Sequence, residues 1–263
     1  MPQYETLIYD KAPNGVVTIT LNRPDRMNTL GGTMKPDLYD AFQNQMLNDR
    51  DVRCVILTGS GERAFCAGSD LTEVSFDGGK PYPANGYAGI AQRFDLDKPV
   101  IASVGGICLG GGFELALSCD MIVASERAVF GLPEPKVGVI AIGGGIHRIV
   151  RQIGIKQAMG PLLTGRNIAA REGYEMGFVS EVVPHENLDE AVAELCGQII
   201  ANAPLAVRLS KALAMWGLEQ PTLADALAKQ AEHPSFQRWI SAEDTREGPK
   251  AFAEKRAPQW KGR

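Results

Sequence analysis

The sequence has no long apolar run, and this absence bears first on membranes. None of its apolar stretches reaches the ~18–20 residues that cross a bilayer, although 44% of the 263 residues are hydrophobic. The first residues, Met-Pro-Gln-Tyr-Glu-Thr, contain neither the basic nor the apolar region of a signal peptide. We therefore expect a cytoplasmic protein with no membrane partner.

Metal-binding patterns are also missing. The chain has only three histidines, and it contains no C-x-x-C or C-x-x-H spacing. These absences predict no metal site. The cysteines are odd in number, widely spaced and mostly inside apolar runs, so we expect reduced, buried thiols. They are Cys54, Cys66, Cys108, Cys119 and Cys196.

Positive charge is scarce as well. The formal net charge is −4, and the expected helix over residues 33–47 carries only Lys35. A nucleic-acid partner is therefore not expected, because phosphate binding needs a basic face. The glycine clusters do not form G-x-x-x-x-G-K-[ST], which excludes a nucleoside triphosphatase of that type. Gly68-Ser69-Asp70 lacks the G-x-S-x-G pattern of a hydrolase nucleophile.

What the chain does have is the patterning of an α/β core. Residues 7–9 and 16–21 predict a β-hairpin around the turn at 13–15. Residues 33–47 predict a helix whose buried face consists of Met34, Leu38, Phe42 and Met46.

Buried strands are predicted further along. Residues 52–58, 99–104 and 121–124 are apolar and β-branched, as in strands covered on both faces. A helix that starts near Gly110 lies between the last two. Residues 74–86 are rich in glycine and proline and predict a surface loop.

The character of the chain changes after Pro184. Four segments have helical patterning and are separated by proline or glycine breaks. They are residues 187–201, 205–218, 222–232 and 243–255. The pattern thus predicts an α/β core followed by a helical C-terminal section.

Three consecutive glycines and two carboxylates carry the functional argument. Gly110 to Gly112 open the predicted helix, Glu114 follows in its first turn, and Glu134 stands between two prolines. A helix N-terminus presents unpaired N–H groups and favours negative charge. Carboxylates beside such donors suit acid–base chemistry next to a stabilised oxyanion.

Each of these features also has a purely structural interpretation. The glycines would allow the helix to pack tightly against a strand. Glu114 would interact favourably with the positive end of the helix dipole, and Glu134 would be an ordinary turn residue. The local pattern alone does not decide between these interpretations.

Several separated motifs resemble the crotonase (enoyl-CoA hydratase/isomerase) superfamily, and they occur in that family's order along nearly the whole chain. The motifs are Leu-Asn-Arg-Pro (21–24), Arg-Ala-Phe-Cys-Ala-Gly-Ser-Asp-Leu (63–71), Cys-Leu-Gly-Gly-Gly-Phe-Glu-Leu-Ala (108–116), Phe-Gly-Leu-Pro-Glu (130–134), Leu-Thr-Gly-Arg (163–166) and the stretch 247–256.

The resemblance implies a spiral core of repeated ββα turns over residues 1–184. It also implies a helical C-terminal region, residues 185–263, that supports a homotrimer or a hexamer made of two trimers. The substrate would be an acyl-CoA thioester, with coenzyme A as part of the substrate and no permanently bound cofactor.

The same resemblance implies roles for individual residues. The backbone N–H groups of Ser69 and Gly111 would hold the thioester oxygen. Glu134 would donate a proton to C2, while Glu114 would hold and activate water. This pair indicates hydration of an enoyl-CoA, or dehydration of a 3-hydroxyacyl-CoA such as carnitinyl-CoA.

Further positions follow from the resemblance. Arg26 and the backbone near Ala67 would contact the nucleotide part of coenzyme A. Phe252 and Lys255 would reach the adenine end from a neighbouring subunit, although a core Phe and a solvated Lys on an amphipathic helix fit the pattern as well.

One departure from the family pattern stands near the second glutamate. Ile142 occupies a position where hydratases often have a glycine whose N–H helps to hold water. We expect its branched side chain to narrow or reshape the acyl pocket. This keeps an alternative open: double-bond isomerisation, C–C hydrolysis or thioester hydrolysis on an unusual acyl group.

Overall fold

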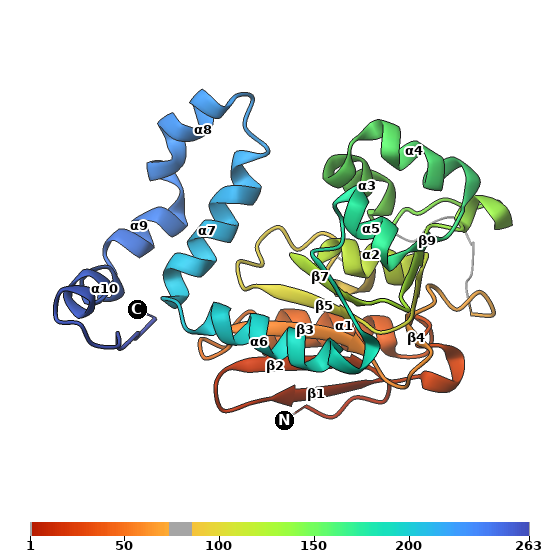
Figure 1. Cartoon of the computed structure of the whole chain (residues 1–263), viewed down its shortest axis with the longest axis horizontal. Coiled ribbons are helices and arrows are strands. Elements are labelled where there is room, and N and C mark those ends of the chain that lie inside the picture. Colours follow the sequence, from red (N-terminus) through yellow and green to blue (C-terminus); the bar gives the residue numbers. More distant parts are fainter. Residues whose placement is uncertain (1, 74–85, 263) are drawn as a thin grey trace.

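Two β-sheets form the centre of the structure (Figure 1). The computed structural model describes residues 2–73 and 86–262. The strands are β1 (Leu7–Lys11), β2 (Val16–Leu21), β3 (Cys54–Gly59), β4 (Ala64–Cys66), β5 (Val100–Val104), β6 (Ile107–Leu109), β7 (Met121–Ser125), β8 (Val129–Gly131), β9 (Ile168–Ala169) and β10 (Glu181–Val183). The larger sheet has the order β1-β2-β3-β5-β7-β10, and the smaller has the order β4-β6-β8-β9.

Helices cover these sheets and extend beyond them. They are α1 (Met34–Asp40), α2 (Gly111–Ser118), α3 (Gly145–Ile153), α4 (Ile155–Thr164), α5 (Ala170–Met176), α6 (Leu188–Ile200), α7 (Pro204–Gly217), α8 (Leu223–Lys229), α9 (Pro234–Ile240) and α10 (Asp244–Ala253). No described helix combines the length and the apolar character that a bilayer-spanning segment needs.

The chain alternates between the two sheets in a repeating unit. β3, β5 and β7 lie side by side and parallel in the larger sheet, and each is followed by a strand of the smaller sheet. A helical segment follows each pair: Tyr87–Gly89 after β4, α2 after β6 and Glu134–Val137 after β8. This repeat is the ββα spiral that the sequence resemblance implies.

Local patterning accounts for the first elements. β1 and β2 pair antiparallel, with Leu7 opposite Leu21, as the predicted hairpin requires. α1 continues into a π-helical turn, Ala41–Met46. The four residues of the predicted apolar face are fully buried, so that prediction is confirmed; they are Met34, Leu38, Phe42 and Met46.

A second apolar layer covers the outer face of the larger sheet. α6 lies across this sheet (Figure 1) and packs Leu188, Val192 and Cys196 against the strands. The Sγ atoms of Cys196 and Cys54 are 3.7 Å apart. All five cysteines are free and buried, as predicted.

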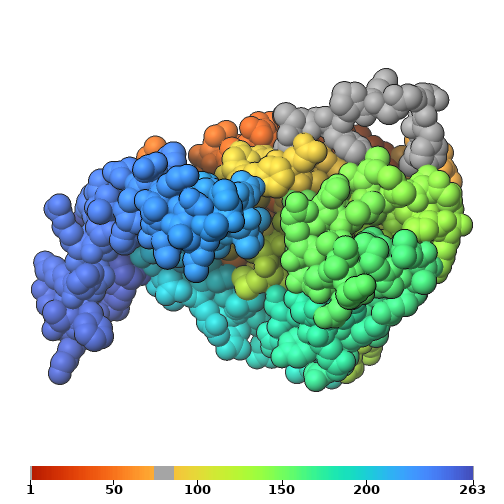
Figure 2. Space-filling view, turned by 90° about the horizontal axis from the view of Figure 1, so that it is seen from above, coloured from red at the N-terminus to blue at the C-terminus, as the bar shows by residue number. Residues whose placement is uncertain are grey.

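The C-terminal helices leave the sheets. In Figure 2 the blue segments form a lobe that extends beyond the rest of the molecule. The large apolar side chains that are exposed on this lobe are Met215, Leu218, Leu223, Leu227, Ile240 and Phe252. The division of the chain at residue 184 stays a prediction. The loop predicted at 74–86 lies outside the described residues, except for Gly86.

The sequence interpretation missed α9. Residues between 232 and 243 were expected to form a break because they contain a proline. Pro234 instead stands at the first helical position, where its missing N–H costs nothing. The His233 side chain accepts a hydrogen bond from the Ser235 N–H at 3.2 Å and caps the helix.

The contact of α2 with β4 can be tested with two helical glycines. A Cβ at Gly112 would overlap the carbonyl oxygen of Cys66, whereas a Cβ at Gly197 of α6 would meet nothing within 4 Å. Both changes to Ala gain about 1 kcal/mol of helix propensity. Overpacking costs roughly 1–3 kcal/mol, so we expect Gly112→Ala to lower the free energy of unfolding and Gly197→Ala to raise it. Urea denaturation measures both; equal effects would contradict the close contact.

Candidate active site

The backbone before Ser69 lies directly against the start of α2. Gly68 has φ +99°, which favours glycine. A Cβ on Gly68 would lie 2.9 Å from the Leu109 carbonyl oxygen and 3.2 Å from the Gly111 nitrogen. Only a glycine therefore permits this approach of two segments that are distant in sequence.

The approach brings the main chain at Gly68, directly before Ser69, against Gly110 and Gly111. Gly111 is the first residue of α2, so its N–H has no acceptor within the helix. The positive end of the helix dipole adds to its attraction for negative charge. The Leu30 N–H donates to the Gly68 carbonyl at 2.8 Å and holds the residue next to Ser69 in place.

Glu114 lies one turn further along α2 and is only 4% exposed. Its Oε1 accepts a hydrogen bond from the Gly145 N–H at 2.8 Å. Burial raises the pKa of Glu114 to about 7, and the negative charge of Glu134 acts in the same direction. The N–H groups of Gly145 and Gly143 oppose this shift without cancelling it.

Glu134 starts the 3-10 helix Glu134–Val137 and turns its carboxyl group toward the glycine triplet. A Cβ on Gly110 would lie 3.1 Å from its Oε1. Its Oε2 is buried and has no hydrogen-bond partner among the described residues. Burial raises the pKa of Glu134. Burial thus raises the pKa of both carboxyl groups, and Glu134 lies near enough to Glu114 to act on its pKa.

Ile142 follows Glu134 along the chain, and its effect on the acyl pocket stays a prediction. Its side chain is 62% exposed, and its N–H donates to the Ile140 carbonyl at 2.9 Å. The N–H is therefore already engaged, and the side chain is open to solvent in this chain. Glu114 is held by Gly145 instead.

Two residues beside the carboxyl groups were missed. The positive charge of the Arg148 guanidinium opposes part of the rise in the pKa of Glu114. The same guanidinium donates a hydrogen bond to the Ala91 carbonyl at 2.7 Å. Tyr87 is buried, and its hydroxyl lies 2.5 Å from Ser69 Oγ. Tyr87 directly follows the predicted loop, so no local periodicity indicated its position.

The residues expected to bind the nucleotide are divided between two parts of the molecule. Arg26 is exposed at the end of the 3-10 helix Pro24–Arg26, and the adjacent Met27 carbonyl accepts from the Ala67 N–H at 3.0 Å. Phe252 is 87% exposed on α10, and Lys255 follows that helix. Figure 1 places α10 at the far left and β4, which ends directly before Ala67, at the right, so one chain does not bring these four residues together.

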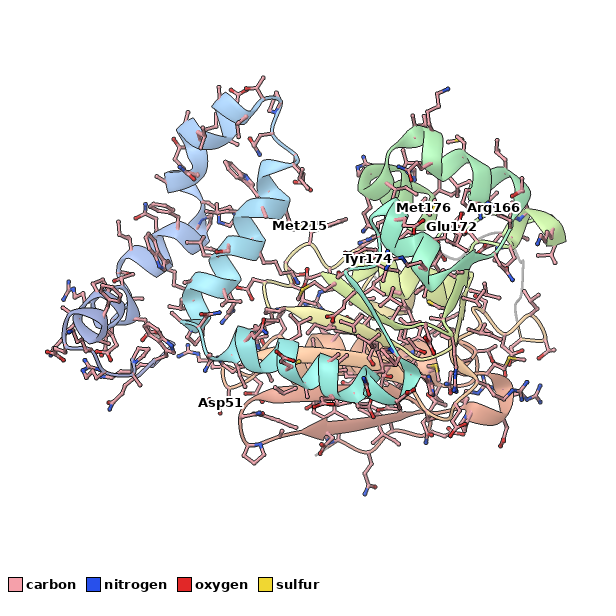
Figure 3. All side chains as sticks on the ribbon, viewed as in Figure 1. Asp51, Arg166, Glu172, Tyr174, Met176 and Met215 are labelled. Carbon is pink, nitrogen blue, oxygen red and sulfur yellow. The ribbon has the colours of Figure 1, made fainter. Side chains whose placement is uncertain are left out.

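Arg166, from the motif at 163–166, has a structural partner. It forms a two-pronged ion pair with Glu172, with N–O distances of 2.6 and 3.0 Å. Figure 3 labels both residues where α4 leads into α5. Among the described residues, no cluster of three or more His, Cys, Asp or Glu side chains would hold a metal ion.

The fold consists of two interleaved sheets, and the site places two carboxyl groups with raised pKa values beside main-chain amides at a helix N-terminus. Together they define a class of enzymes that combine acid–base chemistry with a stabilised oxyanion. Comparison with known proteins agrees with this class. The model of the family described as enoyl-CoA hydratase/isomerase matches residues 11–263. A carnitinyl-CoA dehydratase of Salmonella typhi is 39% identical over 94% of this chain and 95% of its own length. One from Proteus mirabilis (strain HI4320) is 38% identical, with the same coverage.

Solved structures show the same relationship. An enoyl-CoA hydratase from Bacillus anthracis has a TM-score of 0.88 and 37% identity, covering 98% of this chain and 100% of its own. An enoyl-CoA hydratase from Mycobacterium tuberculosis H37Rv has a TM-score of 0.89 and 34% identity, covering 99% and 100%. The chain belongs to the enoyl-CoA hydratase/isomerase family, as the sequence motifs predicted.

The raised pKa of Glu114 has a consequence for stability. Its folded-state pKa of about 7 exceeds the usual 4.5, so stability that is present below pH ~4.5 is lost as the pH rises through 7. Glu114→Gln keeps an acceptor for the Gly145 N–H and removes the charge. At pH 8 we expect the variant to exceed wild type by up to about 3 kcal/mol in free energy of unfolding, with no such gain at pH 4.

Urea denaturation at both pH values measures this difference. Glu175→Gln, an exposed change on α5, controls for the loss of one surface charge. A gain that is the same at pH 4 and pH 8 would show that Glu114 is not held in an unfavourable charged state.

Proposed function

We propose that this chain is an acyl-CoA hydro-lyase. It adds water across the C2–C3 double bond of an enoyl-CoA, or removes water from a 3-hydroxyacyl-CoA. One observation carries the proposal: two buried carboxyl groups with raised pKa values stand beside the main-chain amides at the start of α2. The relatives support it, since they include a carnitinyl-CoA dehydratase and an enoyl-CoA hydratase.

The substrate's oxygen is the first point of recognition. In this proposal the N–H groups of Ser69 and Gly111 donate to the thioester carbonyl. Negative charge develops on that oxygen as C2 gains enolate character, and fixed amides meet the charge without reorganising. One such donor contributes roughly 3–4 kcal/mol in comparable sites.

Proton transfer is divided between the two glutamates. The oxygen of water bonds to C3 while Glu114 takes a proton from that water, and Glu134 gives a proton to C2. Dehydration follows the same steps in reverse. Burial raises the pKa of Glu114 and of Glu134, so each carboxyl group can hold a proton nearer to neutral pH than an exposed carboxyl group does.

Coenzyme A would extend from this centre to the surface. Arg26 and the main chain near Ala67 are proposed contacts for its nucleotide part. Phe252 and Lys255 would come from a neighbouring subunit, because α10 lies far from α2 in the same chain. We accordingly propose a homotrimer, or a hexamer built of two trimers. The apolar side chains exposed on the C-terminal lobe support such an assembly.

Glu134→Gln tests the proton donor. The amide keeps the size of the side chain but cannot deliver the proton, so we expect kcat to fall by about 10²- to 10⁴-fold with little change in KM. Loss of absorbance of the conjugated bond in trans-2-enoyl-CoA thioesters reports the rate. Glu175→Gln should retain wild-type kcat. A Glu134→Gln variant with wild-type turnover would rule out this role, and a wild-type protein inactive on short, branched and aromatic enoyl chains would contradict hydration itself.

Light scattering after gel filtration tests the assembly. We expect wild type at three or six times the mass of one chain. Leu218 is 84% exposed on the C-terminal lobe, and Leu218→Asp should dissociate the assembly and weaken coenzyme A binding. Ile8→Asp on β1 is the matched control. A wild-type protein that is monomeric at micromolar concentration would contradict the shared binding site.

A further inference from the structure

Tyr87 lies beside the proposed oxyanion donors and beside Glu114. It begins the 3-10 segment Tyr87–Gly89 and is 4% exposed. The backbone around it turns sharply, because Gly86, Ala88 and Gly89 have φ values of +78°, +51° and +73°. At this sharp turn the Tyr87 side chain is buried in the protein.

Three contacts fix the position of the ring. The hydroxyl lies 2.5 Å from Ser69 Oγ. A Cβ on Gly111 would overlap the same hydroxyl oxygen. A Cβ on Gly143 would lie 2.8 Å from Cδ1 of the ring and 2.5 Å from Oε2 of Glu114. The ring therefore extends from the N-terminus of α2 to the edge of the Glu114 carboxyl group.

A fourth contact comes from the opposite direction. The Nζ of Lys35, which belongs to α1, lies 5.3 Å from the centroid of the Tyr87 ring. A cation over an aromatic face is attractive. The hydrogen bond to Ser69 and this contact hold the ring from two sides, so it forms a fixed surface.

We propose that Tyr87 is a specificity-determining residue whose ring forms the wall that limits the size of the acyl group beyond C3. This inference rests on the proposed function, because it takes the thioester oxygen to lie at Ser69 and Gly111 and C3 to lie near Glu114. Any acyl group that spans these points runs along the ring. The wall then admits short acyl chains and excludes long or branched ones.

Binding of saturated acyl-CoA thioesters tests the wall without requiring turnover. Isothermal titration gives the affinities of wild type and variants for butyryl-CoA and octanoyl-CoA. We expect Tyr87→Ala to shift the affinity ratio toward octanoyl-CoA by at least tenfold. Tyr87→Phe keeps the ring and should stay within twofold of wild type. Tyr174→Ala, which removes an exposed tyrosine from α5 (Figure 3), is the control, and its affinity ratio should also stay within twofold of wild type.

The outcomes separate the wall from the hydration activity. An unchanged ratio in folded Tyr87→Ala overturns the wall, as does an equal shift in Tyr87→Phe. Tyr87→Leu provides the same comparison if the Ala variant does not fold. Failure of wild type to bind either thioester overturns the proposed function and the wall together. Binding without hydration of any enoyl-CoA contradicts only the hydration reaction.

Discussion

The close approach of residues 66–69 to the start of α2 is the constraint on which the site depends. A Cβ at Gly68 would meet the Leu109 carbonyl, and one at Gly112 would overlap that of Cys66. Because these positions lack side chains, the main chain at Gly68, directly before Ser69, lies against that of Gly110 and Gly111. The interleaved sheets supply this contact, since β4 and β6 are parallel neighbours that end at the same edge.

The same packing determines the electrostatics of the carboxyl groups. Glu114 is placed in the first buried turn of α2, and Glu134 follows β8, the neighbour of β6. Both are removed from water, which disfavours the charged form and raises their pKa values. The fold thus brings the pKa of Glu114 to about 7, at the expense of some stability above that pH.

Much of this could be predicted from sequence, and the gaps have physical causes. Periodicity was sufficient for the hairpin and for the buried face that includes Met34 and Phe42, since both depend on local alternation. The smaller sheet was missed because its strands are two or three residues long, too short to show a period. The glutamates were found through their motifs. Tyr87 was not, because its approach to Gly111 and Gly143 arises only from tertiary packing.

A crystal structure with butyryl-CoA bound tests the central claim most directly. We expect the thioester oxygen to lie about 2.7–3.1 Å from the main-chain nitrogens of Ser69 and Gly111. We also expect the carboxyl groups of Glu114 and Glu134 to face the C2–C3 bond. A thioester oxygen bonded elsewhere, or a carboxyl group turned away from that bond, would contradict it.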